Sequence, residues 1–363
     1  MLPRPNANAE EYNRILELRF KNNLKCKENF DRYQKARECG YKTECDYLPV
    51  KMDYEVSSHC NFRCTMCLMS EIGNDRPANM SFERFKESID MQQGLVEVKL
   101  QGMGEPLLNP DFFKMVDYAV ANHIWVRTVT NASLLHINDN YKKMIDSKVG
   151  EIQISVDGAK KETFECIRRG SNFEQVVENC RMLNEYAESK GEQWRSSCWM
   201  LVQKENVNEV EELLELAAKM KFVRLTYSIA ISDWGKDNWA EINNGKEVID
   251  YFTDEFAEKL IQRGKELGIT VTFWDGKDKY VYDEKKDKIC AWLFSRAYIS
   301  ADMRIVPCCV VCDSNTCDMG DACDFENEWN NNKYKEFRQA HLNGKIPAMC
   351  MNCYENDKRK TNE

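Results

Sequence analysis

Residues 59–67 read HCNFRCTMC and follow directly on the strand-like run Met52–Val56. Within this stretch Cys60, Cys64 and Cys67 have the spacing CxxxCxxC. Three thiolates in so short a turn can hold three irons of a [4Fe-4S] cube and leave the fourth iron open to a small molecule. A four-cysteine site would be closed and would serve electron transfer. The triplet therefore predicts a cluster that takes part in chemistry.

A repeating strand–helix pattern surrounds this triplet. Strand-like runs occupy Met52–Val56, Val96–Gln101, Trp125–Thr130, Glu151–Val156, Ser197–Val202 and Val223–Ile229. Helical patterns lie between them, at Ser81–Gln93, Pro110–Ala121, Asn138–Ser147, Asn172–Lys190 and Val207–Met220. This alternation predicts a parallel sheet with right-handed crossovers. Because six units fall short of a closed eight-stranded barrel, we expect an α/β fold with an open, partial (β/α)6 TIM-like barrel and with chemistry at the C-terminal strand ends.

The composition divides the chain into three regions. Residues 1–50 form a predicted N-terminal helical extension, in which Glu10–Asn22 carries apolar positions at helical spacing. Residues 51–280 form the predicted barrel, which ends with a helix at Lys246–Leu267 and a strand at Ile269–Trp274. Residues 281–363 form a small cysteine-rich domain. We place the boundary near residue 280, within the charged linker Lys277–Lys288.

The charge and hydropathy of the chain exclude several classes of partner. The net charge of -9 leaves no overall basic footprint for nucleic acid. No apolar run approaches the roughly 20 residues of a membrane helix, and Met1–Asn6 lacks the apolar core of a signal peptide. We therefore expect a cytoplasmic protein that does not bind a membrane, and the overall charge disfavours nucleic acid as a partner without excluding a local basic patch.

The 17 cysteines indicate metal ligation. Cytosolic thiols stay reduced, and these cysteines cluster as CxxC and CC pairs, which favours ligation over disulfides. Zinc is the main alternative to iron–sulfur because it also takes four-cysteine sites. A CxxxCxxC triplet without a fourth ligand is a poor zinc pattern, and His59 is badly placed to complete a tetrahedron beside Cys60. The pattern therefore favours iron–sulfur.

The first strand with its three cysteines resembles the radical S-adenosylmethionine (SAM) superfamily. In that family the open iron binds the amino and carboxylate groups of SAM, and an electron from the cluster releases a 5'-deoxyadenosyl radical. The resemblance makes Cys60, Cys64 and Cys67 ligands of a SAM-binding [4Fe-4S] cluster and implies an electron donor such as flavodoxin or ferredoxin. In many members an aromatic residue precedes the third cysteine. Here that position holds Met66, whose apolar side chain can fill the same role.

Polar residues at the following strand ends extend this resemblance. The turn 102–106 reads GMGEP and is similar to a family motif whose glutamate contacts the SAM amino group. The SAM-binding residues implied by the resemblance are Gly102, Gly104, Glu105, Asn131, Ser155, Asp157 and either Arg168 or Arg169. Turn capping is the competing interpretation for Asn131 and Asp157, and a surface position is the competing interpretation for either arginine.

A second set of cysteines lies near the C-terminus. It comprises Cys290, Cys308, Cys350 and Cys353, with a predicted hairpin before Cys308 that turns at Ala301–Arg304. This arrangement resembles the SPASM/Twitch extension, and its spacing is similar to the shorter Twitch version. By that resemblance the four cysteines hold one closed auxiliary [4Fe-4S] cluster, whose role would be electron transfer.

The remaining cysteines leave several interpretations open. Cys309, Cys312, Cys317 and Cys323 lie between the auxiliary cysteines and could form another metal site, donate a hydrogen atom or be free thiols. Cys26, Cys39 and Cys45 are a weak candidate for a further site. Cys166, Cys180 and Cys198 fall on helix or strand patterns and are predicted to be buried as small apolar residues.

These cofactors lead to an expected function. An auxiliary cluster that accepts an electron would give oxidation, and a cysteine that returns a hydrogen atom would give epimerisation. We expect a radical SAM oxidoreductase or epimerase that acts on a small sugar, polyol or amino-sugar. The alternative is modification of a ribosomal peptide. The 1–50 region disfavours it, because this region is short and lacks the strands of the leader-recognition domain that peptide-modifying members often carry. A non-catalytic iron–sulfur or zinc protein is a third option. Tyr227, Asp233, Trp234 and Trp239 either line the substrate pocket or pack in the core.

Overall fold

The computed structural model describes residues 8–76, 79–248, 251–275, 280–282 and 288–358. Met1–Asn6 and most of the predicted linker 277–288 lie outside these residues. Among the described residues, every helix is either too short or too polar to span a bilayer.

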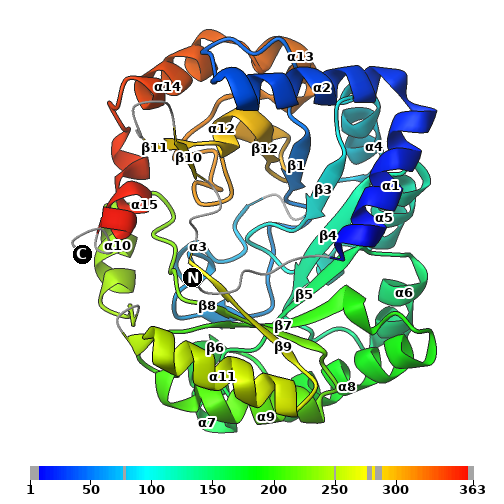
Figure 1. Cartoon of the computed structure of the whole chain (residues 1–363), viewed down its shortest axis with the longest axis vertical. Helices are drawn as coiled ribbons and strands as arrows, with labels where there is room; N and C mark the ends of the chain where they lie inside the picture. Colours follow the sequence, from blue (N-terminus) through cyan, green and yellow to red (C-terminus); the bar gives the residue numbers. More distant parts are fainter. Residues whose placement is uncertain (1–7, 77–78, 249–250, 276–279, 283–287, 359–363) are drawn as a thin grey trace.

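One sheet of ten strands forms the centre of the molecule (Figure 1). Its strands, in spatial order, are β14 (Gly320–Asp321), β13 (Arg304–Val306), β12 (Arg296–Ile299), β1 (Lys51–Tyr54), β3 (Glu97–Leu100), β4 (Trp125–Thr130), β5 (Glu151–Ser155), β7 (Ser196–Leu201), β8 (Arg224–Ser228) and β9 (Thr270–Trp274). From β12 to β9 each strand is parallel to its neighbour, and β13 and β14 are added antiparallel. Two short pairs lie outside this sheet, β2 (Arg63–Cys64) with β6 (Arg168–Arg169) and β10 (Tyr280–Tyr282) with β11 (Lys288–Cys290).

The predicted open α/β barrel is confirmed. The strands follow an arc, and within the described part of the chain β9 and β14 are the two edges of the sheet. The strand predicted at 269–274 is β9, and it extends the parallel arc beyond β8. The first strand of the predicted hairpin is β12, which pairs with β1 on the side away from β3. The sheet therefore runs from the barrel into the C-terminal region.

Helices cover the outside of the arc (Figure 1). They are α4 (Phe82–Met91), α5 (Phe112–Ala121), α6 (Asn140–Asp146), α7 (Lys161–Ile167), α8 (Phe173–Ser189), α9 (Val210–Lys219) and α11 (Asp254–Glu266). Ser81 and Asn172 cap α4 and α8 by accepting the backbone N–H groups of Arg84 and Gln175, so both predicted helix starts are confirmed. Outward-facing side chains such as Val98 and Leu100 are fully buried against this layer.

The N-terminal helices α1 (Ala9–Asn22) and α2 (Leu24–Cys39) close one end of the barrel. The Arg19 guanidinium donates to the carbonyl oxygens of Leu95 at 3.1 Å and Asn122 at 3.0 Å. These two residues precede β3 and β4, so α1 lies at the N-terminal ends of the strands. The opposite end of the barrel is left for the cysteine loop.

The remaining helices are α3 (Met69–Ile72), α10 (Asp237–Asn244), α12 (Trp292–Ser295), α13 (Phe325–Glu328), α14 (Asn332–Leu342) and α15 (Ala348–Lys358). Trp329, which follows α13, donates to the carbonyl oxygen of Tyr47 at 2.9 Å. The Arg338 guanidinium lies 4.2 Å from the centre of the Trp329 ring. These contacts join the C-terminal helices to the segment before β1.

Candidate active site

The cysteine loop follows β1 and lies at the C-terminal ends of the parallel strands. Its middle part, β2, pairs with β6, and the Thr65 N–H donates to the carbonyl oxygen of Ile167 at 2.9 Å. Cys60, Cys64 and Cys67 are all partly exposed. The segment after α7 therefore clamps the loop in place.

The three thiols of this loop fit a cluster. Burial, reinforced by the neighbouring thiols, raises the pKa of Cys60 to about 11 and that of Cys67 to about 12. Burial raises the pKa of Cys64 as well. Three soft sulfur donors thus gather beside Arg168, and bound iron would supply the further positive charge that favours their thiolate forms.

The GMGEP turn packs directly on the start of the cysteine loop. A Cβ atom on Gly104 would lie 2.3 Å from the Ser57 carbonyl oxygen and 2.4 Å from that of His59. On Gly102 it would lie 2.3 Å from Cγ of Glu55. The Glu105 N–H donates to the His59 carbonyl oxygen at 2.8 Å. Both glycines are therefore needed for packing against the loop.

The Glu105 carboxylate is engaged within the protein. It accepts from Thr130 Oγ1 at 2.6 Å and from the Asn131 N–H at 2.8 Å, and only 2% of the residue is exposed. The predicted contact with the SAM amino group stays a prediction, since these donors already hold both carboxylate oxygens.

Asp157 and Arg168 form a buried ion pair beside the loop. Arg168 Nη2 lies 2.6 Å from Asp157 Oδ2, and Asp157 Oδ1 accepts from the Leu201 N–H at 2.8 Å. The other arm of Arg168 donates to the Cys64 sulfur at 3.9 Å. Arg169 is exposed, so Arg168 is the arginine that lies at the site. Asp157 is fully buried and orients this arginine.

Two further predicted residues lie on the same rim. Asn131 follows β4, and its amide donates to Asn61 Oδ1 at 3.0 Å and lies 4.0 Å from the Cys60 sulfur. Ser155 ends β5 and is partly exposed. The structure thus brings Gly102, Gly104, Glu105, Asn131, Ser155 and Asp157 to the C-terminal ends of β3, β4 and β5, with Arg168 beside them on β6. Their contacts with SAM stay predictions.

Several residues that hold the loop could not be singled out from the sequence. Glu55, fully buried after β1, accepts from both terminal nitrogens of Arg76, at 3.0 and 2.6 Å, and from the Ala301 N–H at 3.1 Å. In the sequence, the position of Glu55 at the end of a strand was the one sign that it could lie at the site. Trp234 Nε1 donates to the Met66 carbonyl oxygen at 3.1 Å.

The aromatic residues considered for the pocket have different roles. Trp239 Nε1 donates to Glu71 at 2.7 Å, so this tryptophan and Trp234 both support the second half of the loop. Asp233 Oδ1 accepts from the Gly235 N–H at 2.9 Å. Tyr227 is fully buried and stacks on Phe273, so the packing interpretation holds for it.

The interior of the barrel is lined by charged side chains. Glu97 lies 2.7 Å from Lys51 and 3.3 Å from Arg127, and Arg127 lies 2.8 Å from Glu151. Lys99, on the same face of β3 as Glu97, is partly exposed. Burial and the nearby Arg127 lower the pKa of Lys99 to about 8.

The four predicted auxiliary cysteines meet in one place. Cys290, Cys308, Cys350 and Cys353 line a single cavity, whose other walls include Leu293. Burial raises the pKa of Cys308 and of Cys350. Four thiols around an apolar cavity fit a closed four-thiolate cluster. Their role as ligands stays a prediction.

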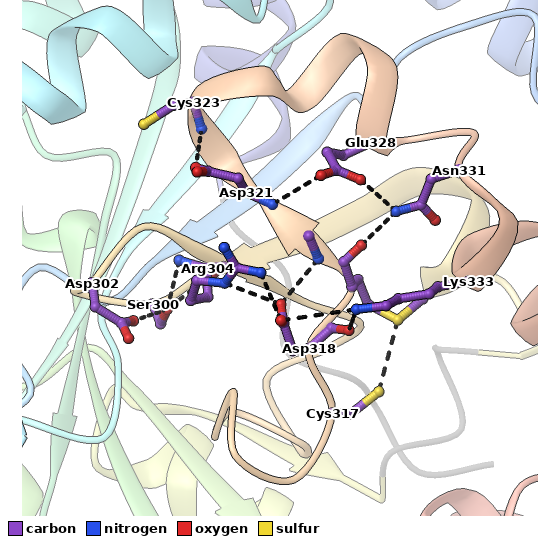
Figure 2. A network of polar contacts seen from close by, with 12 residues as sticks. Ser300, Asp302, Arg304, Cys317, Asp318, Asp321, Cys323, Glu328, Asn331 and Lys333 are labelled. Atoms are coloured by element: carbon purple, nitrogen blue, oxygen red, sulfur yellow. Dashed lines mark hydrogen bonds and ion pairs between the residues drawn. The ribbon is translucent and has the colours of Figure 1, made fainter.

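Three of the four intervening cysteines, Cys309, Cys312 and Cys317, belong to one apolar cluster, whereas Cys323 is exposed. Figure 2 shows Cys317 and Cys323 on opposite sides of a polar network centred on Asp318, which Arg304 contacts at 2.6 Å. Cys312 is buried in an apolar cluster, and Cys309 lies near enough to Lys99 in the barrel interior to influence its charge. Among the described residues, these four cysteines belong to no group of three side chains that could hold a metal ion.

The other cysteines give one correction. Cys180 and Cys198 are buried as predicted, but Cys166 is exposed because it lies on the solvent-facing side of α7. Cys26 is buried and donates to the Leu95 carbonyl oxygen, whereas Cys39 and Cys45 line a surface pocket. These last three cysteines therefore do not share one site.

Comparison with known proteins places both cysteine sets in described families. Residues 54–217 match the radical SAM superfamily, and residues 290–354 match SPASM, an iron–sulfur cluster-binding domain. The mycofactocin maturase MftC of Mycolicibacterium smegmatis is 29% identical over 199 residues, which are 54% of this chain and 48% of that protein. The GTP 3',8-cyclase of Aliarcobacter butzleri is 29% identical over 286 residues, which are 74% of this chain and 81% of that protein. The chain spans about half the length of the MftC relatives that it matches.

Solved structures share the fold. SuiB of Streptococcus suis bound to SAM superposes with a TM-score of 0.61 at 16% identity, over 85% of this chain and 71% of that one. Native anSMEcpe with bound AdoMet gives 0.56 at 17% identity, over 81% of this chain and 84% of that one. The predicted cofactors are confirmed at the level of the family, as a SAM-binding [4Fe-4S] cluster, auxiliary cluster binding and SAM. The chain belongs to the radical SAM superfamily and carries a C-terminal SPASM iron–sulfur cluster-binding domain.

Proposed function

We propose that this chain is a radical SAM enzyme that modifies a peptide. The observation that carries the proposal is the similarity of its barrel to mycofactocin maturases, at 29% to 30% identity over 199 to 200 residues. The SuiB complex with the precursor peptide SuiA also has this fold, with a TM-score of 0.60. The sugar, polyol or amino-sugar substrate that we expected finds no support in these relatives, so its oxidation or epimerisation is not retained.

The residues of the chain supply the positioning that such a reaction needs. When bound, the cluster and SAM supply a 5'-deoxyadenosyl radical that abstracts a hydrogen atom. Arg168, held by Asp157, places positive charge beside Cys64, and Asn131 ties the first turn of the loop to β4. The substrate would enter the barrel interior, where partly exposed side chains such as Lys99 and Trp199 face the opening.

Two side chains of the interior are suited to a peptide. In the part of the chain that the structure describes, no carboxylate lies within ion-pair distance of Lys99, so its ammonium can bind an acidic group of the substrate. Cys309, one of the four predicted hydrogen-atom donors, interacts electrostatically with Lys99. For the four-cysteine cavity we retain the predicted role in electron transfer, and a small electron-donor protein would be the external partner.

The test uses the full chain, reconstituted anaerobically with iron and sulfide and supplied with SAM and dithionite. A pool of synthetic peptides and a pool of sugars, polyols and amino-cyclitols are compared for 5'-deoxyadenosine formation and for mass changes. We expect a peptide to lose hydrogen. A deuterated sample of that peptide should transfer deuterium to 5'-deoxyadenosine. Turnover confined to the sugar pool would refute peptide modification.

Matched variants identify the source of the activity. Cys60→Ser should abolish 5'-deoxyadenosine formation because the cluster loses a ligand. Cys166→Ser changes an exposed thiol and should leave the rate unchanged. Absence of 5'-deoxyadenosine from the parent protein with its clusters intact would favour the non-catalytic alternative.

A further inference from the structure

His341 is a buried histidine with a free ring nitrogen. It lies in α14, is 2% exposed and lines the same cavity as Cys290, Cys308, Cys350 and Cys353. Its Nε2 atom is buried and has no hydrogen-bond partner among the described residues. Because buried polar atoms rarely lack a partner, this nitrogen points to a group that binds in the cavity.

A chain of hydrogen bonds holds the other nitrogen of the His341 ring. The Cys290 N–H donates to the hydroxyl oxygen of Tyr354 at 2.9 Å, and the same oxygen lies 2.9 Å from His341 Nδ1. The tautomer that we adopt has the Tyr354 hydroxyl as the donor to Nδ1. Nδ1 is then an acceptor, and a neutral ring must carry its proton on Nε2. Burial lowers the pKa of His341 to about 4, so the ring is neutral near pH 7.

The side chains that line the cavity include few hydrogen-bond acceptors other than sulfur. Apart from the cysteines, His341, Trp292 and Tyr354, the side chains that line it are apolar, among them Leu293 and Phe337. The unpartnered nitrogen therefore belongs to a residue in the wall of a cavity that four cysteines also line. A four-thiolate cluster in this space would present both cysteine sulfurs and sulfide ions as acceptors.

We propose that His341 donates an Nε2–H hydrogen bond to a sulfur atom of the auxiliary iron–sulfur cluster and thereby raises its reduction potential. Reduction adds negative charge to the cluster, and an N–H donor stabilises the reduced form more than the oxidised form. Tyr354 acts as a positioning residue, since its hydroxyl fixes the tautomer of the ring. This proposal rests on the auxiliary cluster and holds for any substrate.

The first test measures the midpoint potential of the auxiliary cluster in the reconstituted full chain, by redox titration followed with EPR. SAM is added to separate the two signals, because it binds the open iron of the other cluster. We expect His341→Phe to lower the potential with iron and sulfide content unchanged. Tyr354→Phe should lower it less. A potential equal to that of the parent protein in His341→Phe would overturn the proposal.

A control variant separates the hydrogen bond from cavity packing. Phe337→Leu alters an apolar wall of the same cavity and removes no donor. It should leave the potential close to that of the parent. If it lowers the potential as much as His341→Phe does, packing is the cause and the proposal fails.

A spectroscopic test does not depend on the potential. Exchange into D₂O should shift Fe–S stretching bands in the resonance Raman spectrum of the parent and shift them less in His341→Phe. His341→Gln, which keeps an N–H donor, should load the cluster and recover part of the potential. Loss of the auxiliary cluster in both variants would overturn the proposal, because Nε2 would then be a ligand of the cluster. Direct coupling of a histidine nitrogen to iron in pulsed EPR would overturn it for the same reason.

Discussion

Glu105 shows how single residues at the rim combine two tasks. Thr130 and Asn131 donate to its carboxylate, and its own N–H donates to the His59 carbonyl oxygen. The same residue thus joins β3, β4 and the cysteine loop. An ammonium group that approached Glu105 would meet a carboxylate already fixed in direction, which lowers the entropy cost of binding.

For single residues, the resemblance to the radical SAM superfamily predicted which residues lie at the site better than it predicted which of them contact each other. Asp157 and Arg168 are both at the site, but no pattern in the sequence indicates that they bind each other. Glu55 and Trp234 were not identified as loop supports, because their partners, Arg76 and Met66, are set by the path of the chain in space.

Lys99→Met should stabilise the protein near pH 7. Burial and Arg127 lower the pKa of Lys99 from 10.5 to about 8, so the unfolded chain binds this proton more tightly than the folded chain does. The resulting decrease in the free energy of unfolding is complete below pH 8, becomes smaller as pH rises from about 8 to 10.5, and is absent above that range. The variant should therefore melt at a higher temperature than the parent at pH 7, with a smaller difference at pH 10.

Thermal melts followed by circular dichroism would measure this difference. Lys114→Met, at a lysine whose side chain is 67% exposed, is the control and should show no such pH-dependent gain. An equal gain for Lys99→Met at both pH values would contradict the assigned cause.

Among the elements, the turn after β3 and the clamp between β2 and β6 hold the cysteine loop from two sides. Strand and helix positions were predicted well because apolar periodicity and capping residues such as Ser81 and Asn172 are local signals. The pairing of β2 with β6 was not predicted, because two-residue strands carry no periodicity.

Gly104→Ala should disturb the loop through this turn. The new methyl group would lie within 2.4 Å of the carbonyl oxygens of Ser57 and His59, and these backbone atoms cannot move independently of the loop. Overpacking of this kind costs about 1–3 kcal/mol. We expect a lower melting temperature, less iron per chain and a large loss of 5'-deoxyadenosine formation.

Gly245→Ala provides the comparison for this variant. Its nearest atom would be 3.6 Å away, and the backbone there has a φ of -62°, which alanine adopts readily. It should keep the iron content and rate of the parent. Unchanged iron content in Gly104→Ala would show that the loop tolerates the added methyl group.

For the whole molecule, the decisive feature is that β12 lies beside β1. Arg296 on β12 reaches Asp53 on β1 at 3.2 Å, so the barrel and the C-terminal region share hydrogen bonds and an ion pair. The predicted hairpin was right in position, but its place in the sheet depends on packing between distant parts of the chain. The domain boundary near residue 280 stays a prediction, and the sheet extends across it.

A chain that ends at residue 287 should not yield a soluble barrel. Removal of β12 would leave β1 as an edge strand with unpaired backbone groups, which favours aggregation. Size-exclusion chromatography of the anaerobically purified protein should show aggregates or no soluble product. A chain that lacks only residues 359–363 is the control, and a monodisperse 1–287 chain with the secondary structure of the parent would contradict the expectation.

The pairing of β12 with β1 also bears on synthesis of the protein. Asp53 and Arg296 are 243 residues apart, and the ribosome adds about 5–20 residues per second, so β1 waits roughly 12–50 s for its second neighbour. The Ala301 N–H that binds Glu55 arrives later still. Until then the three loop thiols lack their final support. Iron and sulfide would therefore best be delivered after translation, and the nascent chain needs protection from oxidants during that interval.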